Sequence, residues 1–235
     1  MGKESHFDVV VVGSGITGLS TLYHLQRLGV QRVAVSVDEA VHGSVTSRAA
    51  GLITGGQLDN FTRVSHAHGA GTAAALWAFG DAAFDAVATF CKNNGVPLHT
   101  AGRIRLITSP EELTEAQRAV QELAAAGFNG SLDQKAAHRL APFLKERVLA
   151  VQDDGSRGGW IDVASLIAAL LSKSTGVERL AATASIASGS RNLTLRLANG
   201  REVTAEMVVL ATHLATRALV PQISEALVSY ADQWS

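Results

Sequence analysis

Three glycines near the amino terminus have the spacing of a phosphate-binding turn. They are Gly13, Gly15 and Gly18, in the order Gly-x-Gly-x-x-Gly. The first permits a tight turn, the second lets the backbone approach a pyrophosphate, and the third lets the following helix pack closely on the preceding strand. The phosphate charge then lies at a helix amino terminus, where backbone N–H groups and the helix dipole favour anions. The spacing therefore predicts a dinucleotide-binding site.

The segments on both sides of this turn are those that such a site requires. Residues 7–12 are apolar apart from Asp8, which is typical of a parallel strand buried on both faces. Leucine recurs every third residue within 16–28, as in an amphipathic helix, and Gly29 is a residue type that commonly ends one. Residues 32–37 have the pattern of a second strand. The glycines therefore lie between a predicted strand and a predicted helix, the context that the motif requires.

A site of this kind also needs an acidic residue, about twenty residues further on, to bind the adenosine ribose hydroxyls. Asp38 lies at that distance from Gly18, and Glu39 follows it. The predicted strand, however, ends at Val37, one residue before the acid. Two interpretations stay open: either the strand is shifted by one residue and Asp38 binds the ribose, or the ribose contact is weakened.

The rest of the chain alternates predicted helices and strands, so the fold class is α/β. Residues 42–57 are rich in Gly, Ser and Thr and predict a loop, and 152–159 have the composition of a linker. Helices are predicted over 65–93, 111–126, 133–140 and 162–172, and strands over 103–108, 177–187, 192–198 and 202–210, with a hairpin turn at 198–200.

Composition limits the classes of function. The chain has 235 residues, of which 47% are hydrophobic and 17% charged, which is typical of a soluble globular protein. The net charge of −1, without a cluster of Lys or Arg, gives no basis for nucleic-acid binding or for an anionic membrane surface. The amino-terminal apolar run is too short for a signal sequence or a transmembrane segment. The single cysteine, Cys91, fits a reducing compartment, so a cytoplasmic location is expected.

Four segments together resemble the D-amino-acid oxidase/sarcosine oxidase/glycine oxidase family of FAD-dependent oxidoreductases. The resemblance covers most of the chain, and the combination is more specific than any one segment. The segments are Gly13 to Gly18 with 19–25 (Leu-Ser-Thr-Leu-Tyr-His-Leu), 46–53 (Thr-Ser-Arg-Ala-Ala-Gly-Leu-Ile), 158–162 (Gly-Gly-Trp-Ile-Asp) and 208–212 (Val-Val-Leu-Ala-Thr).

This resemblance implies a Rossmann-like FAD-binding domain, with a doubly wound parallel sheet and a β-meander, and non-covalent FAD as the cofactor. Covalent relatives have a histidine close to the position of Arg48, which argues for the non-covalent form. The implied contacts are Gly13, Gly15, Ile16, Thr17 and Gly18 at the pyrophosphate, Asp38 at the ribose, Thr46, Ser47, Arg48, Ala50, Gly51 and Leu52 along the ribityl chain and isoalloxazine, Ala184 at the adenine, and Ala211 and Thr212 on the other side.

The implied reaction is oxidation of a CH–NH bond of a small amine or amino acid, by hydride transfer to the flavin. The sequence identifies no catalytic base. It also identifies no metal site, because zinc-ligand spacing is absent and the chain has one cysteine. Arg48 has two interpretations, a bidentate ligand of the flavin or of a substrate carboxylate, and a surface residue. His99 is expected to be an ordinary polar residue, and Trp160 is expected to pack under the linker at 152–159.

The chain departs from the family in two respects. His213 follows Ala211 and Thr212 at a position where the family has glycine. Family members are also more than a hundred residues longer, so the chain is expected to be an FAD-binding domain over 1–75 and 155–235 with a partial α+β substrate domain over 76–154. A missing carboxy-terminal half or a partner subunit would complete it. Two alternatives remain, a non-catalytic dinucleotide-binding subunit and an NAD-dependent dehydrogenase.

Overall fold

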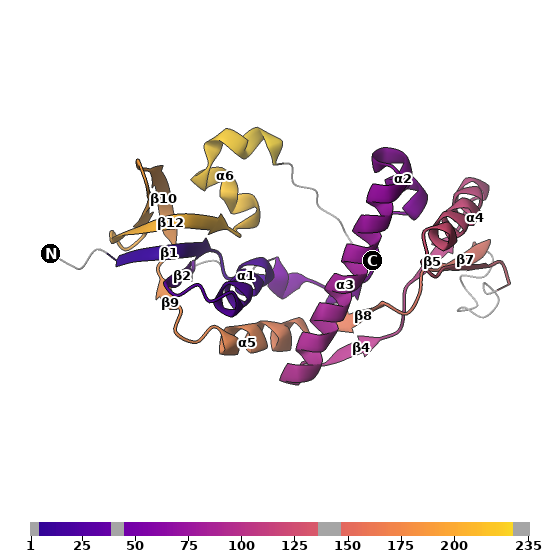
Figure 1. Ribbon diagram of the computed structural model, residues 1–235, viewed down its shortest axis with the longest axis horizontal. Coiled ribbons are helices and arrows are strands. Elements are labelled where there is room, and N and C mark those ends of the chain that lie inside the picture. Colours follow the sequence, from indigo (N-terminus) through magenta and orange to yellow (C-terminus); the bar gives the residue numbers. More distant parts are fainter. Residues whose placement is uncertain (1–4, 39–44, 136–146, 228–235) are drawn as a thin grey trace. The chain divides into compact units, whose positions relative to one another are not determined.

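The computed structural model describes residues 5–38, 45–135 and 147–227. It divides into two compact units (Figure 1), unit 1 (Met1–Ala49 with Val163–Ser235) and unit 2 (Ala50–Asp162). These bounds differ from the expected boundaries at 75 and 155. The first boundary differs because residues 52–54 pair with the strand at 158–160, and Gly56 is hydrogen-bonded to Asp81. These contacts join the segment after Ala50 to unit 2.

Unit 1 contains a six-stranded sheet in the order β10-β11-β12-β1-β2-β9. The strands β12, β1, β2 and β9 are parallel to one another, whereas β10, β11 and β12 form an antiparallel meander. This is the predicted arrangement of a parallel sheet with a β-meander. The strands are β1 (Ser5–Val12), β2 (Val33–Ser36), β9 (Glu178–Leu180), β10 (Thr183–Ser188), β11 (Leu193–Leu197) and β12 (Glu202–Leu210).

The apolar run of β1 lies at the centre of this sheet, between β12 and β2. Val10 and Val11 are fully buried, as expected of a strand covered on both faces. Helix α1 (Ile16–Arg27) follows β1 and packs against α5 (Val163–Lys173). Gly29, at φ +81°, lies just past α1, and its N–H donates to the carbonyl of Gln26. The predicted helix end is thus confirmed, because glycine adopts this left-handed conformation at little cost.

The prediction of one strand over 177–187 is wrong, because the structure has two strands there. β9 pairs with β2, whereas β10 pairs with β11. Residues 181–182 lie between them, so the chain changes partner strand over two residues. A run of β-forming residues does not reveal such a change, since both pieces have the same pattern. The predicted hairpin turn at 198–200 is confirmed, with Gly200 at φ +81°.

Unit 2 combines small antiparallel sheets with helices, which agrees with the predicted α+β domain. Helix α2 (Phe61–His68) packs against both α3 (Ala70–Asn94) and α4 (Pro110–Ala125), and Phe61, Trp77 and Phe128 form an aromatic cluster in the core there. The first sheet has β3 (Leu52–Thr54), β8 (Gly158–Ile161) and β4 (Leu98–Thr100), the second β5 (Ile104–Ile107), β7 (Ala150–Asp153) and β6 (Ser131–Asp133), and the helices are α2 (Phe61–His68), α3 (Ala70–Asn94) and α4 (Pro110–Ala125).

Three local predictions in unit 2 need correction. The helix predicted over 65–93 is two helices, because Gly69 at φ +84° ends α2 and precedes α3. The loop predicted over 42–57 contains β3, and the linker predicted over 152–159 contains the end of β7 and the start of β8. Most of the helix predicted over 133–140 lies outside the described residues.

Among the described residues, α3 is the one helix long and apolar enough to cross a membrane by length and composition. Helices of water-soluble proteins pass the same test, and α3 is held by polar contacts within unit 2. Asp81 accepts a hydrogen bond from the backbone N–H of Gly56, and Arg157 forms ion pairs with both Asp81 and Asp85. Hydrogen bonds from Arg157 lower the pKa of Asp85. The apolar window of α3 is 17% buried, and these contacts join the helix to other segments of unit 2.

Candidate functional site

The glycine turn between β1 and α1 has the geometry of a phosphate cradle. Gly13 adopts φ +110°, and a Cβ atom there would lie 2.5 Å from the carbonyl oxygen of Ala211. Its backbone N–H donates to the carbonyl of Ser36 at 2.9 Å, which fixes the turn to the end of β2. The position therefore accepts only glycine, because a side chain would meet both an unfavourable φ and a backbone atom.

Gly18 lets α1 approach the turn closely. A Cβ atom at Gly18 would lie 1.9 Å from the carbonyl oxygen of Gly13 and 3.5 Å from Cβ of Ala211. Gly15 differs, since its φ is −72° and its Cβ position meets only the Thr46 hydroxyl, at 3.1 Å. Gly13 and Gly18 are thus needed for packing, whereas Gly15 leaves open the side on which a ligand would approach.

The amino terminus of α1 is suited to an anion. Ile16, Thr17 and Gly18 form its first turn, which holds no acidic residue, and no side chain caps it from the N-cap residue Gly15. The N–H of Ile16 donates to the Thr46 hydroxyl oxygen at 3.1 Å. The first N–H groups of a helix have no partner within it, so they are available to phosphate oxygens.

Thr46 reaches this turn from a short 3₁₀ helix, Thr46–Arg48. The predicted site residues Thr46, Ser47 and Arg48 therefore lie in unit 1 with the cradle, and Thr46 contacts it directly. Ser47 and Arg48 are exposed, which leaves both interpretations of Arg48 open. The hydrogen bond between the Ile16 N–H and the Thr46 hydroxyl joins residues thirty positions apart. Apart from the resemblance to the family, nothing in the sequence indicates this contact.

Ala211 and Thr212 lie at the end of β12, beside β1. The N–H of Ala211 donates to the carbonyl of Val12 at 2.8 Å, and Thr212 N is 3.4 Å from the Cβ position of Gly13. The structure thus brings these two predicted residues to the glycine turn, although they are about two hundred positions away in the sequence. Parallel strands place their carboxyl ends at one edge of a sheet, which is where dinucleotides bind in this architecture.

The predicted ribose contact, Asp38, lies two residues beyond the end of β2. The N–H of Val37 donates to the carbonyl of Leu180 at 3.1 Å, so the pairing extends to Val37, and Asp38 follows it in an exposed position. A pocket of about 330 Å³ opens here, lined by Val37, Arg179, Leu180, Ala181 and Ala182. Contact of Asp38 with a ribose stays a prediction; Glu39 lies outside the described residues.

The predicted adenine contact, Ala184, lies on β10. The register between β10 and β11 shifts between Thr183 and Ser185, so Ala184 lies at a β-bulge and is exposed. The buried Ser36 of β2 holds the start of β10, because its hydroxyl donates to the carbonyl of Ala181 at 2.9 Å and lies 2.7 Å from the Thr183 hydroxyl. The sequence analysis did not single out Ser36, which resembles any small strand residue.

The other predicted flavin contacts, Ala50, Gly51 and Leu52, belong to unit 2. Gly51 is buried at φ +77°, and its carbonyl accepts a hydrogen bond from the N–H of Ile161 at 2.9 Å. Leu52 lies opposite Trp160 in the β3-β8 pair and is 71% exposed. Trp160 is itself 47% exposed and stacks on His99 at 4.1 Å, so the expectation that it packs under a linker is wrong. Flavin contact of these residues stays a prediction.

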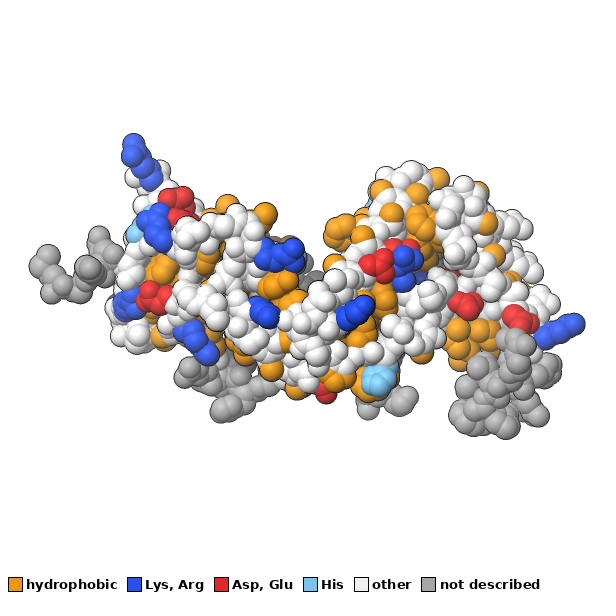
Figure 2. Space-filling view, turned by 60° about the horizontal axis from the view of Figure 1, so that its bottom comes forward, with side chains coloured by type: hydrophobic (Ala, Val, Ile, Leu, Met, Phe, Trp, Pro, Cys, Tyr) orange, Lys and Arg blue, Asp and Glu red, His pale blue; other side chains and the backbone are white. Residues whose placement is uncertain are grey.

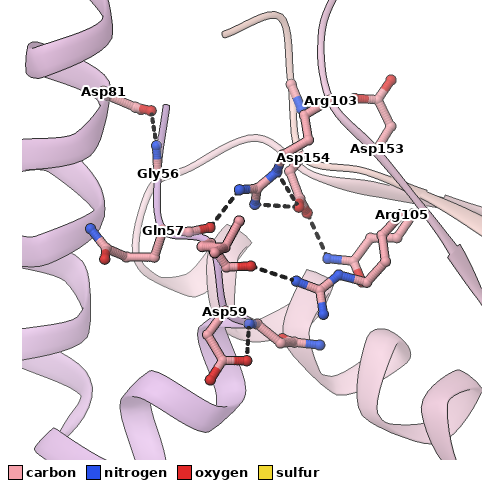
Figure 3. Close-up of polar contacts among 12 residues, drawn as sticks. Gly56, Gln57, Asp59, Asp81, Arg103, Arg105, Asp153 and Asp154 are labelled. Atoms are coloured by element: carbon pink, nitrogen blue, oxygen red, sulfur yellow. Dashed lines mark hydrogen bonds and ion pairs between the residues drawn. The ribbon is translucent and has the colours of Figure 1, made fainter. Parts of the chain in front are cut away.

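A network of polar contacts in unit 2 also escaped the sequence analysis (Figure 3). The guanidinium of Arg103 pairs with the buried carboxylate of Asp154 at 2.6 Å, donates to the carbonyl of Gln57, and lies 5.4 Å from the ring of Trp77. Gln152 donates to the second Asp154 oxygen at 2.6 Å. These groups are joined across about fifty residues, a distance over which sequence patterns carry no information. The network fixes the segment after β3 to the second sheet.

Two other possibilities for a site in unit 2 are less well supported. A pocket of about 240 Å³ is lined by Leu58, Arg63, Arg105 and Glu115 among others. Its arginines are already engaged, since Arg63 binds Glu115 through two hydrogen bonds and Arg105 donates to the carbonyl of Leu58. Within the described ranges, no group of three His, Cys, Asp or Glu side chains is placed to hold a metal ion.

The sheet order, the meander and the glycine cradle define a dinucleotide-binding protein of the Rossmann-like class. A family model described as FAD dependent oxidoreductase matches residues 8–230, and the chain belongs to that family. The family uses FAD, and the cradle fits such a group, because the backbone excludes a Cβ atom at Gly13 and Gly18, whereas the Cβ position of Gly15 meets no backbone, only the Thr46 hydroxyl. A search of curated proteins finds no match.

Solved structures with the same fold include a dehydrogenase, an oxidase and a deaminase. L-Proline dehydrogenase from P. horikoshii is 18% identical with a TM-score of 0.72, and the match covers 92% of this chain and 55% of that one. Glycine oxidase from Geobacillus kaustophilus is 20% identical with a TM-score of 0.67, and the match covers 93% of this chain and 58% of that one. L-Amino acid deaminase from Proteus vulgaris, with its specific insertion sequence deleted, is 17% identical with a TM-score of 0.71, and the match covers 95% of this chain and 57% of that one. The chain thus spans a little over half the length of these proteins.

Proposed function

We propose that this chain is the FAD-binding part of an oxidoreductase that oxidises a CH–NH bond of an amine or an amino acid. The observation that carries the proposal is the cradle of Gly13, Gly15 and Gly18, lined by Ala211 at the carboxyl edge of a parallel sheet. The names of the similar structures, a proline dehydrogenase, a glycine oxidase and an amino acid deaminase, support this class of substrate. FAD, when bound, supplies the acceptor for the hydride.

The residues of unit 1 would bind and orient the cofactor. Backbone N–H groups at the start of α1 would hold the pyrophosphate. The Thr46 hydroxyl, which accepts a hydrogen bond from the N–H of Ile16, would add a polar contact at the same place. The pocket beyond Val37 accommodates the adenosine, with Asp38 and Ala184 beside it as predicted contacts. No catalytic base is assigned to the chain.

We further propose that additional polypeptide, continuous with this chain or in a partner subunit, completes the substrate site. The similar structures are longer, since the match covers 55–58% of the three chains described. Hydrophobic side chains reach the surface in both units (Figure 2), and in unit 2 Leu58, Phe79 and Leu52 are 87%, 72% and 71% exposed. Burial of this apolar area by additional polypeptide would be favourable.

Titration of the purified chain with FAD and with NAD separates the alternatives. Bound FAD should give absorbance bands near roughly 370 and 450 nm and quenched flavin fluorescence. Binding of NAD in preference to FAD would favour the dehydrogenase. Binding of neither would favour a non-catalytic fragment or subunit that needs a partner to hold the dinucleotide.

The substitution Gly15→Val tests the cradle itself. A Cβ atom at Gly15 needs no unusual φ and meets only the Thr46 hydroxyl, at 3.1 Å, which can give way by a small side-chain shift. The fold should therefore persist while pyrophosphate approach is blocked. We expect FAD affinity to fall by about 100-fold or more, equivalent to roughly 2.7 kcal/mol. Fluorescence titration measures the affinity, and thermal unfolding without FAD checks the fold.

Gly71→Ala in α3 is the control for this experiment, because nothing lies within 4 Å of its Cβ position. It should bind FAD as the unaltered chain does. A Gly15→Val variant that binds FAD with unchanged affinity would show that the cradle is assigned to the wrong residues.

A further inference from the structure

His213 is the one non-glycine residue with a positive φ among the described residues, at +51°. This left-handed region is unfavourable for residues that carry a Cβ atom. Residues held in such conformations gather at functional sites, where the surrounding structure imposes them. The position of His213 therefore requires an explanation.

The turn that holds His213 touches the phosphate cradle. The backbone of Ala211 and Thr212 lies against Gly13, and Ala211 is hydrogen-bonded to the end of β1. Beyond it, the N–H of Ala215 donates to the carbonyl of Thr212 at 3.0 Å, and the Thr212 and Thr216 hydroxyls lie 2.8 Å apart. His213 is thus fixed one residue beyond a backbone segment that contacts the glycine turn.

The charges around this turn favour an anion. His213 is exposed, and the sequence from Ala211 to Ser224 contains Arg217 but no acidic residue. The Nε of Arg217 is buried without a hydrogen-bond partner in the described part of the chain. The first turn of α1, on the other side of Gly13, has no acidic residue either. A pyrophosphate placed there meets the N–H groups at the start of α1 and no carboxylate from these two segments.

We propose that His213 is a cofactor-binding residue whose imidazole N–H donates a hydrogen bond to the dinucleotide pyrophosphate. This proposal rests on the proposed function. Even neutral imidazole has one N–H donor, so the contact does not need a protonated ring. A hydrogen bond to a charged phosphate is stronger than one between neutral groups, which gives a reason to keep a side chain where the backbone favours glycine.

Two substitutions separate the imidazole from the backbone conformation. Asparagine tolerates the left-handed region, so His213→Asn removes the imidazole and keeps the conformation accessible. His213→Gly removes the imidazole and also relieves the backbone. If the imidazole binds the pyrophosphate, both variants should bind FAD about tenfold more weakly, as expected for loss of one charge-assisted hydrogen bond. Without FAD, the melting temperature of the Gly variant should equal or exceed that of the unaltered chain.

The inference is overturned if His213→Gly binds FAD as tightly as the unaltered chain or more tightly, because the side chain then only restricts the site. Weakened binding by the Asn variant alone would overturn it too, because the Gly variant lacks the same imidazole and would still bind FAD normally. With Gly15→Val measured alongside, the two proposals are distinguishable. Loss of binding in Gly15→Val but not in His213→Gly rejects the inference alone, whereas an unaltered chain that binds no FAD rejects both.

Discussion

The substitution Gly18→Val is expected to destabilise the chain by about 3 kcal/mol or more, because it places a side chain against a fixed backbone. The Cβ position lies 1.9 Å from the carbonyl oxygen of Gly13. Gly13 has little freedom to move, since its N–H is bonded to Ser36 and its Cα faces Ala211. Urea or thermal denaturation without FAD measures the loss.

Two other glycine substitutions serve as comparisons for the stability of Gly18→Val. Gly71→Ala, in an open part of α3, should leave stability unchanged or raise it by about 0.5–1 kcal/mol. Gly15→Val should keep the fold and lose the ligand, whereas Gly18→Val should lose the fold. A Gly18→Val chain as stable as the unaltered one would mean that α1 does not approach the turn as closely as the structure has it.

Removal of the Asp154 carboxylate should have an effect of similar size on unit 2. Its side chain is 2% exposed and that of Arg103 is 14% exposed, so Asp154→Ala leaves a largely buried guanidinium without its partner. Loss of one member of a buried pair costs about 3–5 kcal/mol. Trp77 lies on Arg103, so tryptophan fluorescence during urea denaturation should report the loss.

A double variant distinguishes a broken ion pair from a general packing defect. Arg103→Met with Asp154→Leu replaces both charges by apolar groups, and such replacements cost less than breaking the pair. Arg118→Ala is the surface control, since Arg118 is 67% exposed and pairs with Glu122 within one helix turn. It should change stability by less than about 1 kcal/mol. Equal losses in the Asp154→Ala variant and the surface control would contradict a buried-pair role.

Local patterns predicted the elements that depend on neighbouring residues. The glycine turn, the helix end at Gly29 and the hairpin at 198–200 each follow from the conformations that glycine or asparagine adopts. The break at Gly69 was missed, although Gly69 and Gly71 were visible there, because glycine inside an alanine-rich helical pattern is often tolerated, as Gly71 is within α3. Short strands such as β3 and β4 were missed because three residues give too little periodicity.

The sequence alone determined the phosphate-binding turn, the strand before it, the helix after it and the family, because these depend on residues close together in the chain. The tertiary structure decided which distant segments complete the site. It brings Thr46 and Ala211 to the glycines, divides 177–187 between two partner strands, and buries Arg103 with Asp154. It also reveals the left-handed backbone of His213. Such contacts join residues far apart in the chain, and their free energy depends on burial and geometry that no local pattern records.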